Sequence, residues 1–359
     1  MHPALRTPIC DLLGMEVPIV QTGMGWVATP ELVAAVCNAG AFGFLAAATV
    51  PPERIDEAIE RTRALTDRPF GVNFLMDAPG ADRIADALIR HRVRAAGYNR
   101  APDARRIARL KEAGVVCVPT CGHPKHAEKA EKLGADIIIV QGGEGGGHTG
   151  AVPTSLLVSQ AVDRVRVPVV AAGGFRDGRG LVAALAFGAA GVAMGTRFLL
   201  TAESPVPDVT KRRYLEASVD DVLVTREIDG LPQRVVRNEL VRRLEASGGL
   251  GGLALALRSA LALRRETGAS LRELLAAGFA MRRHQRLTRT QMLMAANAPI
   301  LARAAMVDGD PVRGYLPGGT VAGVIDDVPS CAELVARIVA EAEETLARLA
   351  AGAAPAPRD

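Results

Sequence analysis

The segment that most clearly suggests chemistry is a glycine-rich run ending in a histidine, Gln141-Gly142-Gly143-Glu144-Gly145-Gly146-Gly147-His148. Each glycine costs about 0.5 to 1 kcal/mol of folding stability relative to alanine. A run of this length therefore indicates that something must approach the backbone closely, and a planar ligand near Gly146 and Gly147 would do so. His148 can act as an acid, a base or a hydrogen-bond donor near neutral pH. The alternative is a histidine in a solvent-facing loop.

Two more glycine-rich turns have the composition of a phosphate site. Gly173 and Gly174 follow one short apolar run, and Gly195 and Thr196 follow the next. Glycines leave backbone N–H groups uncovered, the Thr196 hydroxyl adds a donor, and the N-termini of the helices that follow supply partial positive charge. The chain has no Walker lysine and no G-x-G-x-x-G near its first strand, which argues against ATP and against a Rossmann dinucleotide domain.

Two further strand ends carry residues suited to a flat ligand. The sequence Gln21-Thr22-Gly23-Met24-Gly25 has small residues that allow close approach to the backbone, with a plain tight turn as the alternative. Asn73 follows another apolar run, and its amide can both donate to and accept from a heteroaromatic ring. We therefore place Thr22, Gly23, Met24 and Asn73 among the candidate binding residues.

The elements that must position these residues follow one repeating pattern, in which a short apolar run, a turn and an amphipathic helix succeed one another. Eight such runs are present: Val17–Gln21, Phe42–Ala46, Phe70–Phe74, Val93–Gly97, Val115–Pro119, Ile137–Gln141, Pro168–Ala172 and Gly191–Met194. Their uninterrupted apolar character is typical of parallel strands covered on both faces, and eight successive units close naturally into a barrel. The sequence predicts an α/β protein with a (βα)8 TIM barrel; an open doubly wound sheet is the alternative.

The repeat stops after residue 199, and residues 211–290 have mostly helical patterns with 16 basic and 9 acidic residues. We predict a mostly helical cap at 209–299, inserted after strand eight into a barrel formed by 1–208 and 300–349. Gly248 to Gly252 would be a hinge within the cap, a last helix would span Ser330–Leu349, and residues 350–359 would be a frayed tail.

Composition excludes several classes of protein. A net charge of +4 and 3% aromatic residues do not favour nucleic-acid binding, and no segment is long and apolar enough for a bilayer. Five scattered cysteines and the lack of a leader pattern predict a cytoplasmic protein. Cys117 and Cys121 beside His123 and His126 raise a zinc hypothesis, but Cys117 fits a buried strand thiol better, so we predict no metal.

The chain resembles the nitronate monooxygenase family, once called 2-nitropropane dioxygenases, and the related flavin enoyl-acyl-carrier-protein reductases. The family signature matches Gln141 to Gly150, with Gly145 in place of the usual alanine. Other matching segments are Pro18–Met24, Gly71–Asn73, Ala171–Gly174, Gly195–Phe198, Val307–Asp310 and Gly318–Gly323. One departure is at Gly319-Thr320, because the family usually has glutamine after this glycine.

The resemblance implies a flavin oxidoreductase with FMN at the barrel mouth. Its phosphate would lie at Gly173, Gly174, Gly195 and Thr196. Its ring and ribityl chain would lie near Thr22, Gly23, Met24, Asn73 and Gln141. His148 would lie beside the substrate and the reactive flavin nitrogen. Since no Rossmann fingerprint is present, NAD(P) would visit the flavin site as a transient co-substrate.

More narrowly, Gln141 to Gly150 and Val209–Leu215 are similar to an actinobacterial subgroup that acts in steroid C/D-ring degradation. The resemblance implies dehydrogenation of a 5-hydroxy-hydrindane carboxyl-CoA with NAD. Arginines in the cap suit the phosphates of such a CoA thioester, unless they form a solvated surface in a chain with 38 Arg and 5 Lys. The candidates are Arg212, Arg213, Arg237, Arg242 and Arg243.

Two alternatives stay open at this point. One is a nitronate monooxygenase that oxidises small alkyl nitronates with O2, and the other is a non-catalytic subunit that binds flavin or acyl-CoA. In each case the partner is a small molecule, and a homodimer is compatible with the sequence.

Overall fold

The computed structural model describes residues 1–99, 102–246 and 289–352. It divides into two compact units. Unit 1 comprises Met1–Gly145, Gly150–Pro205 and Asp327–Asp359, and unit 2 comprises Gly146–Thr149 and Val206–Asp326. Unit 2 begins before the predicted cap of 209–299 and continues beyond it, from Val206 to Asp326, and it also includes Gly146–Thr149.

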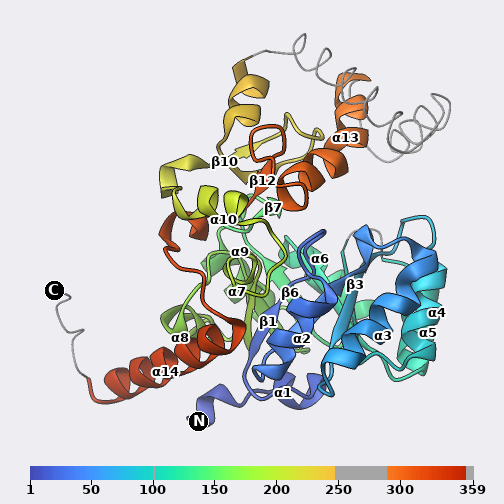
Figure 1. The fold of residues 1–359 in the computed structure, drawn as a ribbon. Coiled ribbons are helices and arrows are strands. Elements are labelled where there is room, and N and C mark those ends of the chain that lie inside the picture. Colours follow the sequence, from blue (N-terminus) through green and yellow to red (C-terminus); the bar gives the residue numbers. More distant parts are fainter. Residues whose placement is uncertain (100–101, 247–288, 353–359) are drawn as a thin grey trace. The chain divides into compact units, whose positions relative to one another are not determined.

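Unit 1 is a closed barrel of parallel strands, in the order β1-β2-β3-β4-β5-β6-β8-β9 (Figure 1). The predicted TIM barrel is confirmed, and the open sheet is excluded. Each strand lies within two residues of a predicted run. The bounds are β1 (Ile19–Gln21), β2 (Phe42–Ala46), β3 (Gly71–Leu75), β4 (Ala95–Asn99), β5 (Val116–Cys121), β6 (Ile138–Gln141), β8 (Val169–Ala172) and β9 (Gly191–Met194).

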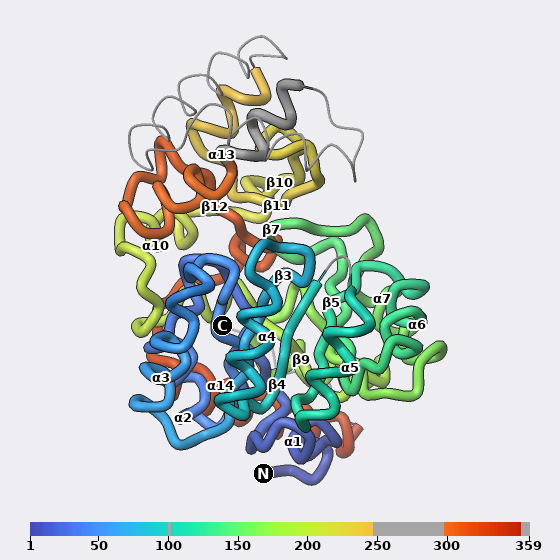
Figure 2. The backbone as a smooth tube through the Cα atoms, turned by 90° about the vertical axis from the view of Figure 1, so that its right-hand side faces the viewer, coloured from blue at the N-terminus to red at the C-terminus, as the bar shows by residue number. Residues whose placement is uncertain are grey.

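Helices cover the outside of this barrel. Figure 2 shows α3 (Ile55–Leu65), α4 (Ala81–Arg90) and α5 (Ala104–Glu112) beside one another outside the strands. The other helices of unit 1 are α1 (Pro8–Leu13), α2 (Pro30–Asn38), α6 (Pro124–Lys132), α7 (Thr154–Val162), α8 (Gly178–Ala186), α9 (Thr196–Leu199) and α14 (Cys331–Ala350), with short 3-10 turns at Pro3–Leu5, Ala47–Thr49 and Pro52–Arg54. Within the described ranges, no helix combines the length and apolarity needed to cross a membrane.

Glycines follow the C-terminal ends of several of these helices. The φ angles of Gly40, Gly114 and Gly134 are 86°, 77° and 97°. This left-handed conformation lets the chain turn from each helix toward the next strand.

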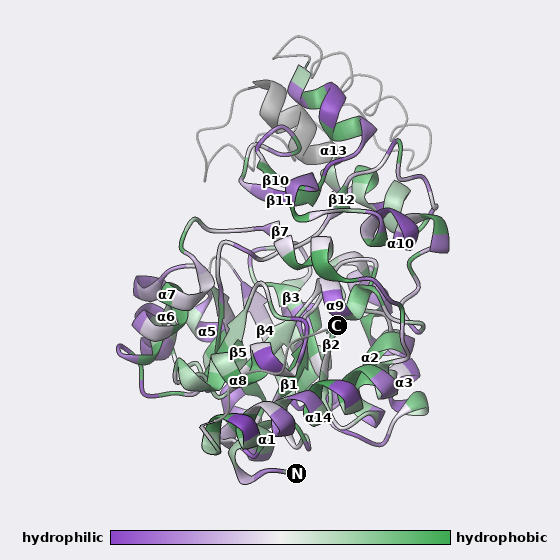
Figure 3. Cartoon of the chain, turned by 90° about the vertical axis from the view of Figure 1, so that its left-hand side faces the viewer, coloured by the Kyte–Doolittle hydropathy of each residue, from purple (hydrophilic) through white to green (hydrophobic). Residues whose placement is uncertain are grey.

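The barrel interior is filled by apolar side chains from seven of its strands. One buried cluster joins Val20 of β1, Phe44 of β2, Ile139 of β6, Val170 of β8 and Ala193 of β9. Side chains from strands on opposite sides of a closed barrel can meet only inside it, so these residues define the inward-facing positions. Figure 3 shows the strands as largely apolar and the surrounding helices as carrying hydrophilic residues.

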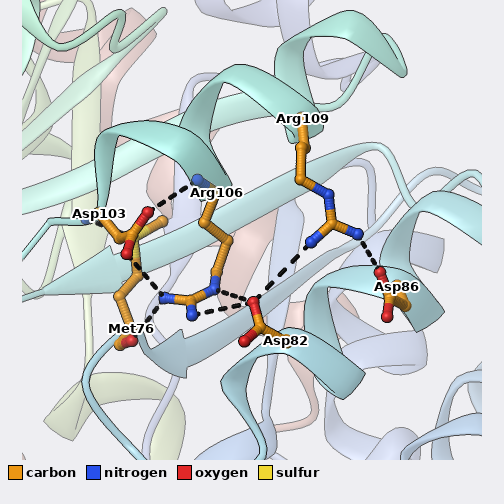
Figure 4. A network of polar contacts seen from close by, with 6 residues as sticks. All are labelled: Met76, Asp82, Asp86, Asp103, Arg106 and Arg109. Atoms are coloured by element: carbon orange, nitrogen blue, oxygen red, sulfur yellow. Dashed lines mark hydrogen bonds and ion pairs between the residues drawn. The ribbon is translucent and has the colours of Figure 1, made fainter.

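Arg106 ties α5 to the neighbouring βα unit (Figure 4). Its guanidinium donates to the Met76 carbonyl oxygen at 2.7 Å and lies 2.9 Å from Asp82 Oδ1. Asp103 caps α5 by accepting from the Arg106 backbone N–H at 2.9 Å. The Arg106 side chain is only 12% exposed, so it contributes buried packing in addition to its ion pair. The neighbouring ion pair between Arg109 and Asp86 is exposed.

Unit 2 contains a small antiparallel sheet that the sequence pattern did not predict. In it β11 (Gln233–Val236) pairs with β10 (Val222–Thr225), β12 (Leu316–Pro317) and β7 (Gly147–His148). Helices α10 (Asp208–Leu215) and α13 (Arg289–Met306) and the 3-10 turns Val219–Asp221 and Thr320–Val324 also belong to this unit. The predicted cap therefore contains helices but also strands. The proposed hinge at Gly248 to Gly252 lies outside the described residues, as does the tail beyond Gly352.

Candidate active site

Inward-facing positions continue to the C-terminal ends of the strands, where barrel enzymes carry their reacting groups. Side chains alternate along a strand, so Thr22 follows inward-facing Val20, Gln141 follows Ile139, and Gly195 follows Ala193. Asn73 lies two residues beyond Gly71, where an added Cβ would overlap the inward-facing ring of Phe44. The structure thus brings these four predicted residues to one end of the barrel.

Close packing joins the predicted residues of β1, β3 and β9. A Cβ added at Gly195 would lie 3.2 Å from Thr22 Oγ1 and 3.4 Å from Met24 Sδ. A side chain at Gly23 would overlap the Asn73 side chain. Thr22, Gly23, Met24, Asn73 and Gly195 therefore form one cluster of small and polar groups.

The two turns predicted to hold phosphate follow adjacent strands, β8 and β9. Gly173 and Gly174 have φ angles of 99° and 85°, which favour glycine. Among the described residues, a Cβ at Gly174 would meet only Glu144 within 4 Å, at 3.4 Å, so the backbone there is open to a ligand. Thr196 begins α9 directly after Gly195. These turns fit a phosphate group, and its binding there stays a prediction.

An unpartnered acceptor at the same end of the barrel fits a heteroaromatic ring. Asn99 ends β4 beside β3 and, by strand alternation with Ala95 of the interior cluster, faces inward. Its Oδ1 is buried and has no hydrogen-bond partner in the described protein. Buried amide oxygens normally accept a hydrogen bond, so this atom suits a ligand N–H. The sequence pattern did not single out Asn99.

Glu144 is a second residue whose role the sequence did not show. Its Oε2 accepts a hydrogen bond from the Thr154 backbone N–H at 2.9 Å and lies 2.5 Å from the Thr154 hydroxyl. The same hydroxyl lies 3.1 Å from the Gly173 carbonyl oxygen. Glu144 therefore fastens the start of the glycine run to α7 and to the turn after β8.

His148, the predicted acid or base, lies in unit 2 with Gly146 and Gly147. Its Nε2 is 2.7 Å from Asp229 Oδ2. The Gln233 side-chain amide donates to the same oxygen at 2.7 Å, and the Leu231 backbone N–H donates to Oδ1 at 3.0 Å. The His148 side chain is 51% exposed and that of Asp229 10%, so a buried carboxylate holds an accessible imidazole.

Asp229 is ionised at neutral pH. Burial raises the pKa of its carboxyl, but hydrogen bonds from His148, Leu231 and Gln233 and the charge of His148 together hold it below the ordinary value of 3.8. An ionised carboxylate beside an imidazole is the arrangement that orients a histidine for proton transfer.

The arginines predicted to bind phosphate are all exposed. Arg213 pairs with Glu216 at 3.3 Å, and Arg242 and Arg243 both pair with Glu239. Arg212 and Arg237 form no ion pair with the described part of the chain, so they are the members of the set best able to receive an anion.

No group of three or more potential metal ligands gathers among the described residues. Cys117 and Cys121 are buried free thiols. Burial raises the pKa of each to about 12, which disfavours the thiolate that binds metal. His123 caps α6 through its Nδ1, which accepts from the Lys125 backbone N–H at 3.2 Å.

Comparisons with known proteins agree with one another over nearly the whole chain. The family described as nitronate monooxygenase matches residues 6–100 and 91–341. The chain is 52% identical over 341 residues to a Mycobacterium tuberculosis protein named (3aS,4S,5R,7aS)-5-hydroxy-7a-methyl-1-oxo-octahydro-1H-indene-4-carboxyl-CoA dehydrogenase, covering 94% of this chain and 96% of that one. A Rhodococcus jostii protein of the same name is 51% identical, covering 97% and 98%. The solved structure of FabK from Thermotoga maritima superposes with a TM-score of 0.78 at 33% identity, covering 97% and 99%.

Proposed function

The chain belongs to the nitronate monooxygenase family and is a flavin-dependent oxidoreductase, and on this basis we propose that it uses FMN and NAD to dehydrogenate a CoA thioester with a hydroxylated hydrindane ring. The observation that carries the proposal is identity of about half of all residues, over nearly the full length of both chains, to two dehydrogenases named for that substrate.

The residues of the barrel mouth fit FMN. Gly173, Gly174, Gly195 and Thr196 would hold the phosphate through backbone N–H groups and a hydroxyl. Thr22, Gly23, Met24, Asn73 and Gln141 would lie along the ribityl chain and ring. Gly146 and Gly147, the other two residues predicted to bind the cofactor, belong to unit 2. Bound FMN would supply a two-electron acceptor for the substrate hydride and return the electrons to NAD.

A side chain of the protein would accept the proton that the substrate loses together with the hydride. In the net reaction, the substrate loses a hydride and a proton, and NAD gains the hydride. We assign the proton to His148, whose imidazole is accessible and is held by an ionised carboxylate. In the chain His148 follows Gly145, the last barrel residue of the glycine run, by three positions.

The substrate's phosphates are the feature that separates this proposal from oxidation of small nitronates. Arg212 and Arg237 are exposed cations of unit 2 without an ion pair in the described ranges, and guanidinium groups bind phosphate oxygens well. They would contact the nucleotide part of CoA, which an alkyl nitronate lacks.

The test is anaerobic titration of the purified flavoprotein with hydroxylated alicyclic CoA thioesters, followed by flavin absorbance. We expect bleaching by the thioester, recovery with NAD, and no rapid oxygen uptake with propionate-3-nitronate. In a His148→Ala variant the flavin should stay bound, and reduction should slow by about 10²- to 10⁴-fold. Brisk oxidation of the nitronate without reaction of any thioester would overturn the proposal.

A further inference from the structure

His148 lies opposite Gln233 of β11 in the antiparallel sheet, and the adjacent residue pair is Gly147 with Arg234. Both side chains of the His148–Gln233 pair reach the same atom, Asp229 Oδ2, at 2.7 Å. Antiparallel pairing fixes the separation of two opposed residues. The sheet thereby sets where His148 stands relative to Asp229.

Asp229 is held by its own loop between β10 and β11. The Gly230 backbone N–H donates to the Arg226 carbonyl oxygen at 2.9 Å, and Gly230 has a φ of 85°. The Leu231 N–H fixes Oδ1 at 3.0 Å, which leaves Oδ2 directed at His148 and Gln233. Contacts within the protein therefore fix the position of this carboxylate.

A further shell of buried groups supports the carboxylate. Gln233 is 2% exposed, and its side chain hydrogen-bonds with Tyr315, which is 7% exposed. Burial raises the pKa of the Tyr315 phenol, with the Asp229 charge adding to the effect, so Tyr315 stays protonated. Tyr315, Gln233 and Asp229 thus form a series of hydrogen-bonded contacts that ends at His148.

From this geometry we propose that Asp229 is the positioning residue of the reaction, holding His148 with its Nε2 protonated so that Nδ1 carries the lone pair that takes the substrate proton. The inference rests on the proposed function and adds to it the ring nitrogen that reacts and the group that selects it. A carboxylate in this place also stabilises the imidazolium that forms when the proton is taken.

The first test reads the imidazole directly and needs no turnover. In ¹⁵N-labelled holoenzyme, long-range ¹H–¹⁵N spectra at a pH where the ring is neutral should show the Nε2–H form for His148. The signal is assigned by its loss in His148→Ala, and the chain has only 6 histidines. In Asp229→Asn the His148 signals should shift toward a mixture of tautomers. An Nδ1–H form in the wild type would overturn the assignment.

The second test is a double-mutant cycle on flavin reduction by the CoA thioester. Asp229→Asn, which keeps the shape of the side chain, should lower kcat about 10- to 100-fold, by analogy with groups that orient functional histidines, and leave KM within about twofold. In the His148→Ala background the same change should have no further effect, because residues that act as a unit are not additive. A similar loss in both backgrounds would show a structural role and refute the proposal.

Asp310→Asn is the matched control, since this aspartate of unit 2 accepts backbone N–H groups of Val312 and Arg313 and contacts none of the histidines that the structure describes. It should keep wild-type turnover. If His148→Ala itself reduced normally, the proposed role of His148 would fail, while the tautomer measurement would still decide whether Asp229 orients the ring.

Discussion

Glu144 of the glycine run contacts Thr154 at the start of α7, and a single carboxylate oxygen lies within hydrogen-bond distance of both the backbone nitrogen and the hydroxyl of the threonine. The run is therefore anchored at its first half in unit 1 and paired as β7 in unit 2. The residues between the two anchors are glycines, which add no side chain to the space near the backbone.

Loss of this first anchor should be measurable in stability. We expect Glu144→Gln to lower the free energy of unfolding by about 2 kcal/mol, because it weakens two hydrogen bonds to a charged acceptor. Thermal unfolding of the flavin-loaded protein measures the change. In a Thr154→Val background the same substitution should cost less, and equal costs in both backgrounds would contradict the coupling.

The open backbone at Gly174 should matter for cofactor binding more than for folding. Gly174→Ala forces a left-handed residue, at about 1 to 2 kcal/mol, and places a methyl group in the predicted phosphate site. We expect at least a tenfold higher FMN dissociation constant by fluorescence titration. Gly114→Ala is the control, since Gly114 has a similar φ and no described residue lies within 4 Å of an added Cβ; this variant should bind FMN normally.

Acid should weaken the attachment of α14 to the barrel. A hydrogen bond from Arg337 and, in addition, the hydrogen bond and charge of Arg197 hold the pKa of Asp327 below 3.8, despite partial burial. A lowered folded-state pKa means that the stabilisation is fully present above the unfolded value and is lost as pH falls through the folded one.

We therefore expect the melting temperature of Asp327→Asn to lie below that of the wild type at pH 7, with the gap closing from about pH 5 downward. Asp11→Asn serves for comparison, because Asp11 forms an exposed ion pair with Arg6, and such pairs contribute about 0 to 1 kcal/mol. A gap at pH 7 that persisted at pH 3 would count against the prediction.

Arginine substitutions should separate phosphate binding from surface charge. Arg212→Gln and Arg237→Gln should each raise KM for a CoA thioester several-fold and leave kcat nearly unchanged. Arg243→Gln removes one charge as well, but from a residue already paired with Glu239 at 2.9 Å. Equal effects of all three variants would indicate nonspecific electrostatics, and increasing salt should then remove them together.

Steady-state kinetics should follow a ping-pong pattern. The sequence has no Rossmann fingerprint, so NAD and the thioester would reach the flavin in turn. Initial rates at several fixed NAD concentrations should give parallel double-reciprocal lines. Intersecting lines would show that both substrates are bound together.

The barrel could be predicted from the sequence because its strands are continuous apolar runs of four to six residues, except the shorter β1, each followed by an independent helix signal. The sheet of unit 2 could not. Two of its strands, β7 and β12, have only two residues, which is too short for any periodicity, and β7 consists of Gly147 and His148, taken from a run whose composition indicates a loop.

The same distinction applies to the candidate site. Glycines and His148 stand out in one segment, and strand alternation then gives the inward residues. Asp229 is 81 positions from His148 and belongs to an Asp-Gly turn, a dipeptide common in turns of every kind. Only the pairing of β7 with β11 brings the two together.

The chain enters unit 2 at residues 146–149, returns to the barrel, and enters it again at residue 206. A fragment cut as 206–326 would thus lack one strand of its own sheet and leave backbone groups of Gln233 and Arg234 exposed at an edge, where strands of other molecules readily add. Such a truncation should self-associate, and a short synthetic peptide spanning the missing strand should compete with that aggregation.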